Sequence, residues 1–464
     1  MSLLKKSKHV YAAIIVVFFL ACAIFGDVGI CPDTETYLKL SPSRDPLYGI
    51  FVHLFAFLGE TMQLRIVSLC QNLLCAFSSI YLLFFLVKRF KTNAFIEFLI
   101  TMCLLIPHIM TPMATVSGMI LCNTILSEGI TLSLYLLFFT ILLQIIYAED
   151  NKKTIRYTII ALLLCVLLVS ARGQLLSVLV VFVMVSGYKF LSMKKAKMLI
   201  FVAILVIAGY AAKIVINNTY NLVANGVFTG NTSQSATVMA NALFTADLNK
   251  KVDFDDAGLN KVYENTYKLM QEEGMHYQYA PKDLCTFVSY YENAHDIIKF
   301  ELAAQNIHDY VLSEGYEDPM DIEMESDRVA NKLYQKVFLN NPAAAVDTFI
   351  KLASSGFIRT VAVLHPILNW YALLAYVVAI GMTVYLFISG RREGRVSPSA
   401  LVMTLVLIMI AGLVVSTALV TMCLSRYVIY NMSIFYIVAL LELCEIVSVN
   451  WRKKNEKLNE ISEK

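Results

Sequence analysis

Charged residues are scarce in this sequence of 464 residues. Asp, Glu, Lys and Arg make up 16% of the chain, whereas soluble domains carry about 25%. Hydrophobic residues make up 58%. A soluble protein of this size needs a polar surface over its apolar core, and so few charges cannot supply one. The composition therefore excludes an ordinary soluble enzyme and favours a protein that lies in a lipid bilayer.

The sequence motifs of several enzyme classes are missing too. The chain contains no glycine-rich phosphate loop, no G-x-S-x-G motif and no kinase signature. It has no Cys-x-x-Cys pair, no His-Glu-x-x-His motif and no basic, aromatic-rich stripe. We therefore expect no nucleotide hydrolysis, no serine hydrolase and no nucleic-acid partner. We also predict no cofactor and no metal site, but the sequence does not exclude a requirement for a divalent metal ion.

Ten apolar stretches approach the length of helix, about 20 residues, that crosses the hydrocarbon core of a bilayer. They lie near residues 10–26, 66–87, 93–108, 125–147, 157–171, 175–190, 198–216, 366–388, 399–421 and 427–447. Lys5, Lys6 and Lys8 precede the first stretch, as in a signal peptide, but no clean cleavage site follows it, so we expect a membrane anchor. The predicted fold class is an all-α polytopic membrane protein with about ten transmembrane helices.

Basic residues mark every second connection between these stretches. Lys and Arg in short loops stay on the cytoplasmic side of a membrane. The clusters are Lys5/Lys6/Lys8, Lys88/Arg89/Lys91, Lys152/Lys153/Arg156, Lys189/Lys194/Lys195/Lys197, Arg391/Arg392/Arg395 and Arg452/Lys453/Lys454/Lys457. This pattern predicts a multi-pass protein of the plasma membrane with both termini in the cytoplasm. Any active site is then expected outside, on residues 27–65, on residues 217–365 or on the short outer turns.

The longest outer segment is acidic. Between residues 217 and 360 it carries 20 acidic and 11 basic residues, a net charge of −9, so the rest of the chain carries +12. Apolar periodicity predicts helices near 257–275, 282–314 and 319–339, with Pro281 and Pro319 placed like first-turn prolines. A further amphipathic helix from residue 341 to 357 is expected to lie on the membrane surface.

These features divide the chain into three parts. Residues 1–216 are predicted to form an N-terminal transmembrane bundle of seven spans, which includes the first outer loop, 27–65. Residues 217–365 form a mostly helical extracytoplasmic domain, and residues 366–464 supply three more spans and a cytoplasmic tail. Within the first outer loop, Tyr48 to Leu58 is too apolar for a plain linker and either lies in the interface or packs on the bundle.

Most of the ten cysteines fall within or at the ends of apolar stretches, where Cys behaves as a small hydrophobic residue. Only Cys31 and Cys285 are predicted to lie outside. A disulfide between these two residues is therefore possible in an oxidising compartment.

Ionisable residues gather at the outer ends of the predicted spans, where a charge is costly unless it is paired or functional. Asp27 and Asp33 follow the first span, and Arg44 lies further along the same loop. A carboxylate there can accept a proton from a hydroxyl group, and an arginine can neutralise a phosphate. On chemistry alone, a set of solvated helix caps remains the alternative.

Five short motifs at these outer ends carry a resemblance. They are Asp33-Thr34-Glu35-Thr36-Tyr37-Leu38, Arg44-Asp45-Pro46-Leu47-Tyr48, Leu126-Ser127-Glu128-Gly129, Ala171-Arg172-Gly173-Gln174 and Ser425-Arg426-Tyr427. In this order they resemble the GT-C superfamily of integral-membrane glycosyltransferases, which includes protein mannosyltransferases and the lipid A aminoarabinose transferase. The sequence departs from those two branches in lacking an adjacent Asp-Glu pair and in having no proline after Arg172.

The resemblance implies a hexosyl- or pentosyltransferase that works with inversion. It would move a sugar from a polyprenyl-phosphate donor in the membrane lipid to an extracytoplasmic acceptor, which could be a cell-envelope glycan, lipid or protein. Asp33 would be the catalytic base. The implied donor-phosphate and substrate-binding residues are Arg44, Arg172, Arg426, Glu128, Tyr37 and Tyr48. Their alternative roles are interfacial: snorkelling arginines, a carboxylate at a helix N-terminus and an aromatic belt.

Other classes of membrane protein stay open. A polysaccharide polymerase or ligase of the cell envelope also has many spans and one large outer loop, but this loop has only Arg328 and Arg359 as arginines. A transporter needs ionisable residues at mid-membrane, where the spans show little besides Lys213 near an outer end. A non-enzymatic scaffold is the third alternative.

Overall fold

The computed structural model describes residues 4–114, 118, 120–247, 250 and 252–462. Its regular elements in these ranges are helices, without any β-strand, and Gly29 and Thr124 form an isolated β-bridge. Ten of the described helices are long and apolar enough to cross a membrane. The prediction of an all-α multi-pass membrane protein with about ten spans is confirmed.

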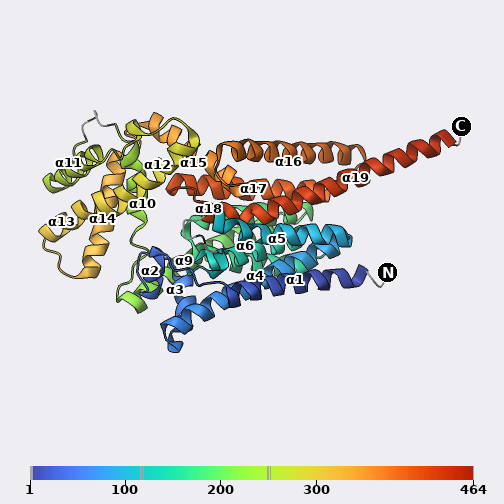
Figure 1. Cartoon of the computed structure of the whole chain (residues 1–464), viewed down its shortest axis with the longest axis horizontal. Coiled ribbons are helices and arrows are strands. Elements are labelled where there is room, and N and C mark those ends of the chain that lie inside the picture. Colours follow the sequence, from blue (N-terminus) through green and yellow to red (C-terminus); the bar gives the residue numbers. More distant parts are fainter. Residues whose placement is uncertain (1–3, 115–117, 119, 248–249, 251, 463–464) are drawn as a thin grey trace.

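The spanning helices run together along the long axis of the molecule (Figure 1). They are α1 (Leu4–Phe25), α4 (Glu60–Phe90), α5 (Ala94–Ala114), α6 (Glu128–Tyr147), α7 (Asn151–Ala171), α8 (Ser177–Ser192), α9 (Met198–Asn225), α16 (Pro366–Arg392), α17 (Pro398–Val420) and α19 (Met432–Ser462). The start of α1 and the end of α19 lie at one end of this bundle, and α10 to α14 lie at the other. We call the latter the outer end, after the sidedness predicted from the basic residues.

The segment after α9 folds into helices over the outer end. They are α10 (Gln234–Thr245), α11 (Ala257–Glu272), α12 (Leu284–Ile297), α13 (Ala303–Ser313), α14 (Pro319–Val337) and α15 (Pro342–Val361). Aspartates begin several of them, because a carboxylate can accept the unpaired N–H groups of a first turn. Asp256 accepts from Gly258 and Leu259, and Asp318 accepts from Met320 and Asp321.

Two details of this segment differ from the sequence prediction. The single helix expected at 282–314 is α12 and α13, joined by a π-helical segment at Ile298–Leu302. Pro319 occupies the first turn of α14 as expected, but Pro281 does not begin a helix. Asp283 caps α12 instead, because its side chain accepts from the N–H of Thr286.

The outer segment packs around aromatic side chains. Phe244 of α10 meets Tyr291 of α12 edge to face, with ring centroids 4.9 Å apart, and Phe287 stacks close by. Helix α10 also packs against α14 and α15, and α15 packs against α16, α17 and α18 (Ser425–Val428). Through α15 the outer segment is therefore anchored to the last three spans.

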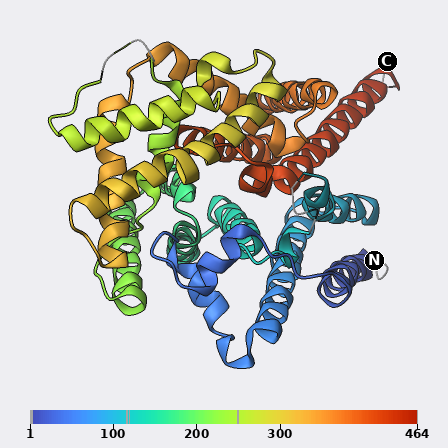
Figure 2. The same cartoon turned by 60° about the vertical axis from the view of Figure 1, so that its left-hand side comes forward.

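The first outer loop covers the rest of the outer end (Figure 2). It contains α2 (Pro32–Leu38), α3 (Pro46–His53) and a short 3₁₀ turn at Ala56–Leu58. Helix α3 packs against α4, α7 and α9, with Tyr48 and Val52 fully buried. Of the two possibilities for Tyr48 to Leu58, packing on the bundle holds for α3, whereas Phe57 at the tip is 82% exposed.

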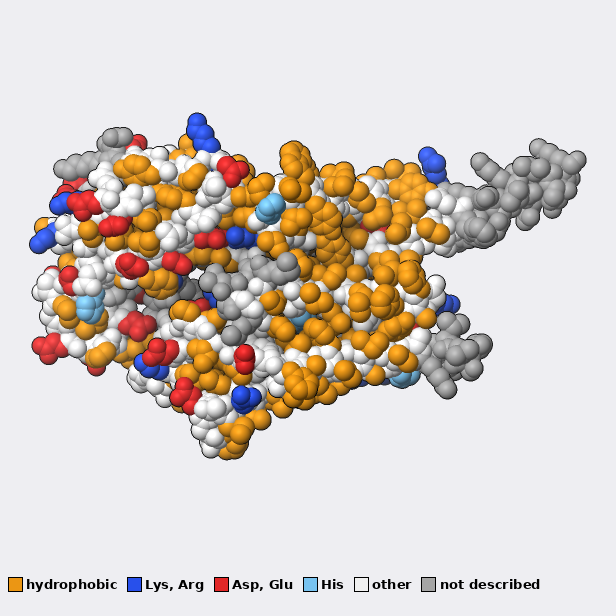
Figure 3. Space-filling view, in the orientation of Figure 1, with side chains coloured by type: hydrophobic (Ala, Val, Ile, Leu, Met, Phe, Trp, Pro, Cys, Tyr) orange, Lys and Arg blue, Asp and Glu red, His pale blue; other side chains and the backbone are white. Residues whose placement is uncertain are grey.

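The surface separates by chemistry along the long axis. Figure 3 shows hydrophobic side chains over the spanning helices and acidic side chains gathered over the outer segment. This matches the charge difference between the outer segment and the remaining chain, because a helix in contact with lipid cannot expose carboxylates without a large cost.

The spans contain more buried ionisable groups than the sequence prediction recognised. Glu97 and Glu442 are both buried in the bundle. Ser7 donates to Glu97 at 2.6 Å, and Thr383 donates to Glu442 at 2.7 Å. The view that the spans hold little besides Lys213 was wrong, because Glu97 and Glu442 lie inside two of the predicted spans. The structure accommodates each carboxylate with a hydroxyl from another helix.

The possible disulfide between Cys31 and Cys285 is absent, and both cysteines are free thiols. Cys31 lies just before α2, and the Cys285 sulfur accepts a hydrogen bond from Asn369 at 3.3 Å.

Candidate functional site

The site begins with α2, which is held against the start of α6 by one threonine. Pro32 occupies the first turn of α2, where its missing N–H costs nothing. Thr34 is buried and its hydroxyl donates to the carbonyl of Ile125 at 3.1 Å. Gly29 and Thr124 bridge the same two chain segments. Asp33, the neighbour of Thr34, is thereby fixed above the outer end of α6.

Arg44 folds back onto α2 from the loop that follows it. Its Nη2 lies 2.6 Å from Asp33 Oδ1, and its Nε donates to the Thr36 hydroxyl at 2.8 Å. Its guanidinium also lies 5.3 Å from the centre of the Tyr37 ring. These contacts hold Arg44 and Asp33 together although both side chains keep about 30% exposure, at 28% and 31%.

A second ion pair lies deeper in the bundle. Glu128 is the first residue of α6, and its side chain is 2% exposed. Arg172, at the end of α7, places Nη1 2.5 Å from Glu128 Oε1. A buried carboxylate needs such a partner, because taking a charge out of water costs on the order of several kcal/mol per ion.

Arg426 connects the two pairs. It lies on α18, immediately before the last span, and its Nη2 is 3.4 Å from Asp33 Oδ2. Its Nε is 3.5 Å from Glu128 Oε1. The five residues Asp33, Arg44, Glu128, Arg172 and Arg426 therefore form one continuous set, which we call the arginine network.

Tyr427 supports the arginine network from one side. The Arg172 guanidinium lies 4.3 Å from the centre of its ring, and the Arg426 guanidinium lies 5.0 Å from it. Cations are attracted to the face of an aromatic ring, most strongly where water is excluded. Tyr427 thus helps to keep two like charges next to each other.

The two tyrosines predicted to bind substrate, Tyr37 and Tyr48, lie behind the arginine network. Tyr37 donates to Ser127 at 3.2 Å, and its ring meets that of Tyr48 edge to face at 4.8 Å. Tyr48 is 0% exposed and donates to Gln71 at 2.7 Å. Tyr48 has no free face for a sugar in this structure, because the ring fills the space between α3 and the bundle.

The charges of the network do not cancel. Three guanidinium groups share two carboxylates, which leaves one positive charge in a partly buried place. Burial alone would raise the pKa of Asp33, but Arg44 and Arg426 outweigh this effect and hold the pKa below its ordinary value. Asp33 is therefore ionised at neutral pH, and the network is suited to attract an anion.

Asp45 is a neighbour of the arginine network that the prediction did not single out. Its Oδ2 accepts from the backbone N–H of Gly173 at 2.6 Å, and its Oδ1 accepts from Asn231 at 2.8 Å. Burial raises the pKa of Asp45, and the bond from Gly173 and the charge of Lys213 oppose this only in part. Asp45 ties the turn that carries Arg172 to the outer segment. The sequence signal that could have identified Asp45 was its position directly after Arg44.

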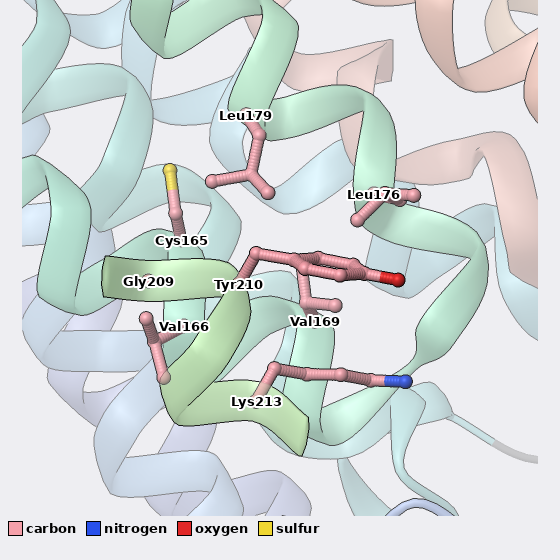
Figure 4. Close-up of a pocket in the computed structure, with 8 residues that line it drawn as sticks. All are labelled: Cys165, Val166, Val169, Leu176, Leu179, Gly209, Tyr210 and Lys213. Atoms are coloured by element: carbon pink, nitrogen blue, oxygen red, sulfur yellow. The ribbon is translucent and has the colours of Figure 1, made fainter. Parts of the chain in front are cut away.

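The space beside Lys213 is small. Figure 4 shows Tyr210 and Lys213 extending side by side from α9, next to Val169 and Leu176. The space they line is only about 10 Å³, no more than a single water molecule needs. Lys213 therefore does not mark a substrate cavity.

Every residue predicted for the site from the sequence lies in the arginine network or directly behind it. Within the described ranges, no group of three or more His, Cys, Asp or Glu residues is placed to hold a metal ion. Ser127, Thr36 and Tyr427 complete the contacts, and all three belong to the motifs that carry the resemblance. Comparison with protein-family models, with curated proteins and with solved structures found no match to this chain.

Proposed function

We propose that this protein is a membrane glycosyltransferase of the kind seen in the GT-C superfamily. It would transfer a hexose or pentose from a polyprenyl phosphate to an extracytoplasmic acceptor with inversion. We place it in the plasma membrane, with both termini in the cytoplasm and the arginine network outside.

One observation carries the proposal. Three arginines from three separate regions of the chain meet at the outer end of the spans, with one positive charge in excess. One guanidinium group can donate two parallel hydrogen bonds to two oxygens of a phosphate, a geometry that the single ammonium group of lysine cannot match. The outer end is where the phosphate of a lipid lies when its apolar chain is in the bilayer. A lipid-linked phosphate fits this place by both charge and depth.

The proposed reaction exchanges one bond at the anomeric carbon of the sugar. Asp33 removes the proton from the acceptor hydroxyl, and the resulting oxygen attacks the anomeric carbon on the face opposite the phosphate. The new carbon–oxygen bond forms as the bond to the phosphate oxygen breaks, and its electron pair leaves with polyprenyl phosphate. Arg44, Arg172 and Arg426 stabilise the charge that develops there. Asp33 then releases its proton to water.

Donor binding would also activate the base. In the free protein Asp33 is a weak base, because two arginines stabilise its charged form. A phosphate that engages Arg44 and Arg426 competes with Asp33 for them, and its negative charge raises the pKa of the carboxyl. Proton abstraction would therefore become efficient only when the donor is present.

The purified chain in lipid vesicles provides the test. We expect incubation with a polyprenyl-phosphate monosaccharide and membrane extract to release free polyprenyl phosphate and to label the acceptor. A polymerase or ligase would instead handle a lipid-linked oligosaccharide, and a transporter or scaffold would leave the sugar-phosphate bond intact. Absence of polyprenyl phosphate release from a panel of hexose and pentose donors contradicts the proposal.

A further inference from the structure

A cleft of about 440 Å³ lies in the outer segment, well within the size range of small-molecule sites. Helices α10, α13 and α14 and the π-helical segment between α12 and α13 form its walls. Its lining mixes apolar, hydroxyl, amide and charged groups, among them Thr232, Met239, Lys299, Phe300, Glu323 and Asp327. No step of the transfer described above uses these residues.

The cleft adjoins the arginine network. The N–H of Thr232, which lines the cleft, donates to the carbonyl of Pro42 at 3.3 Å, two residues before Arg44. The preceding residue, Asn231, donates to Asp45. Burial and the positive charge of Arg44 lower the pKa of Lys299, another lining residue. A ligand in the cleft would therefore have one end close to Asp33 and Arg44.

The π-helical segment supplies two of the side chains at the cleft. A π-helical turn adds a residue to an otherwise α-helical path and is often found at functional sites. Phe300 is 62% exposed there, although it is a large aromatic residue. Lys299 lies 4.6 Å from the centre of the Phe300 ring and makes no salt bridge with any described residue. Phe300 therefore presents an exposed aromatic ring to a ligand, beside a lysine that has no salt-bridge partner among the described residues.

The opposite wall provides carboxylates in fixed positions. Glu323 Oε1 accepts from the Thr232 hydroxyl at 2.5 Å, which leaves its other oxygen for a ligand donor. Asp327 accepts from the N–H and the hydroxyl of Ser235, at 3.1 and 2.9 Å. Side chains held in this way lose little freedom when they bind a ligand, so their hydrogen bonds discriminate well.

We propose that this cleft binds the acceptor of the transfer reaction and that the acceptor is a hydroxyl-rich glycan. The role of this glycan as the acceptor rests on the proposed function. The ability of the cleft to bind a glycan is inferred from the residues that line the cleft. Carboxylate and amide groups pair with sugar hydroxyls, and the Phe300 ring packs on the apolar face of a sugar. A peptide that binds by strand addition is disfavoured, because the walls are helices whose backbone groups bond internally and leave no edge for main-chain pairing.

A blocked cleft provides the first test. The full chain with Cys31→Ser and Cys285→Ser receives one new cysteine, Ser326→Cys in the cleft or Ser313→Cys outside it, and is labelled with a bulky maleimide. We expect labelling at 326 to lower sugar transfer to membrane acceptor at least about tenfold, while binding of fluorescent polyprenyl phosphate changes less than about twofold. Labelling at 313 should change neither quantity. Normal transfer with a fully labelled residue 326 overturns the proposal.

Direct binding provides the second test and needs no donor. Saturation-transfer NMR is recorded on the purified chain with maltotriose, mannotriose and chitotriose. We expect a signal from at least one trisaccharide, with a loss of about tenfold in affinity in Phe300→Ala and Glu323→Gln and no loss in Ser313→Ala. No signal from all three sugars, or binding of a serine-rich peptide in their place, overturns the glycan assignment. Sugar binding without any transfer would contradict the proposed function and leave the cleft assignment intact.

Discussion

Asp33 combines moderate exposure with two arginine partners, and this makes its replacement informative. Asp33→Asn keeps the size of the side chain and removes the proton acceptor, so we expect transfer to fall at least about a hundredfold. Partly exposed ion pairs contribute about 0–1 kcal/mol, so folding should change little. Initial transfer rates and thermal unfolding of the purified variant measure the two effects.

Asp27→Asn is the matched control for this experiment. Asp27 lies in the same loop, but no ion pair joins it to the arginine network. Loss of transfer in Asp27→Asn together with normal transfer in Asp33→Asn would assign the base to Asp27.

We expect that lysine cannot replace any of the three network arginines in sugar transfer. Lysine keeps the positive charge but cannot form two parallel bonds to a phosphate, and a lost charge-assisted bond costs roughly 1.5–3 kcal/mol. Arg426→Lys, Arg172→Lys and Arg44→Lys should therefore lower transfer about tenfold or more. We expect the largest effect for Arg426, whose ion pairs of 3.4 and 3.5 Å are the longest in the network and leave it free to engage a ligand.

Arg328→Lys serves as the control for this series, because Arg328 pairs with Glu325 on the surface of α14. If all three network variants transfer sugar at the rate of the parent chain, the arginines are not phosphate ligands and the proposed mechanism fails.

Glu128 and Arg172 should behave as one unit in stability measurements. Removing one partner of a buried ion pair leaves an unpaired charge and costs about 3–5 kcal/mol. We therefore expect Glu128→Gln and Arg172→Met each to destabilise the chain strongly, and the double variant to lose less than the sum of the two. Thermal unfolding in detergent gives the comparison. Additive losses would mean that the two side chains do not depend on each other.

At the scale of single elements, α15 has two distinct faces. Leu352 and Ala353 are buried against the bundle, whereas Val346 and Ile350 are 55% and 54% exposed. An exposed apolar face next to spanning helices is expected to enter the membrane interface. The placement of α15 against α16 and α17 is compatible with this expectation.

Brominated lipids test the position of α15. In a chain without its two tryptophans, Trp370 and Trp451, a single Ile350→Trp should show fluorescence that brominated lipids quench. Lys268→Trp, at an exposed position of α11, is the control and should show no quenching, because α11 belongs to the part of the outer segment at the far end of the molecule. Equal fluorescence of the two variants in brominated and plain lipids would place Ile350 in water.

At the scale of the whole molecule, the sidedness of the chain can be measured directly. On a cysteine-free background, we expect Asn293→Cys to react with an impermeant maleimide in intact cells and Lys152→Cys to react only after permeabilisation. Asn293 is exposed on α12, and Lys152 is exposed at the start of α7. Reaction at residue 152 from outside would contradict the ten-span topology with cytoplasmic termini.

Properties that are local in the chain could be predicted from the sequence alone. The ten spans follow from the lengths of the apolar runs, because transfer of a helix into lipid depends on the sum over about 20 adjacent side chains. The start of α14 follows from Asp318 and Pro319, since a cap needs only neighbouring residues. The candidate residues of the site could be chosen because they belong to short motifs in the first outer loop and at the outer ends of spans, and these motifs carry the resemblance.

The partners of those residues were decided by the tertiary structure. Asp33 and Arg426 are 393 residues apart, and no local pattern states that they meet. The burial of Tyr48, the hydroxyl that hides Glu442 and the π-helical segment that exposes Phe300 likewise depend on the packing of distant helices. Burial and ion pairing are properties of the space between elements, so the arginine network and the adjoining cleft become visible only when all the helices are in place.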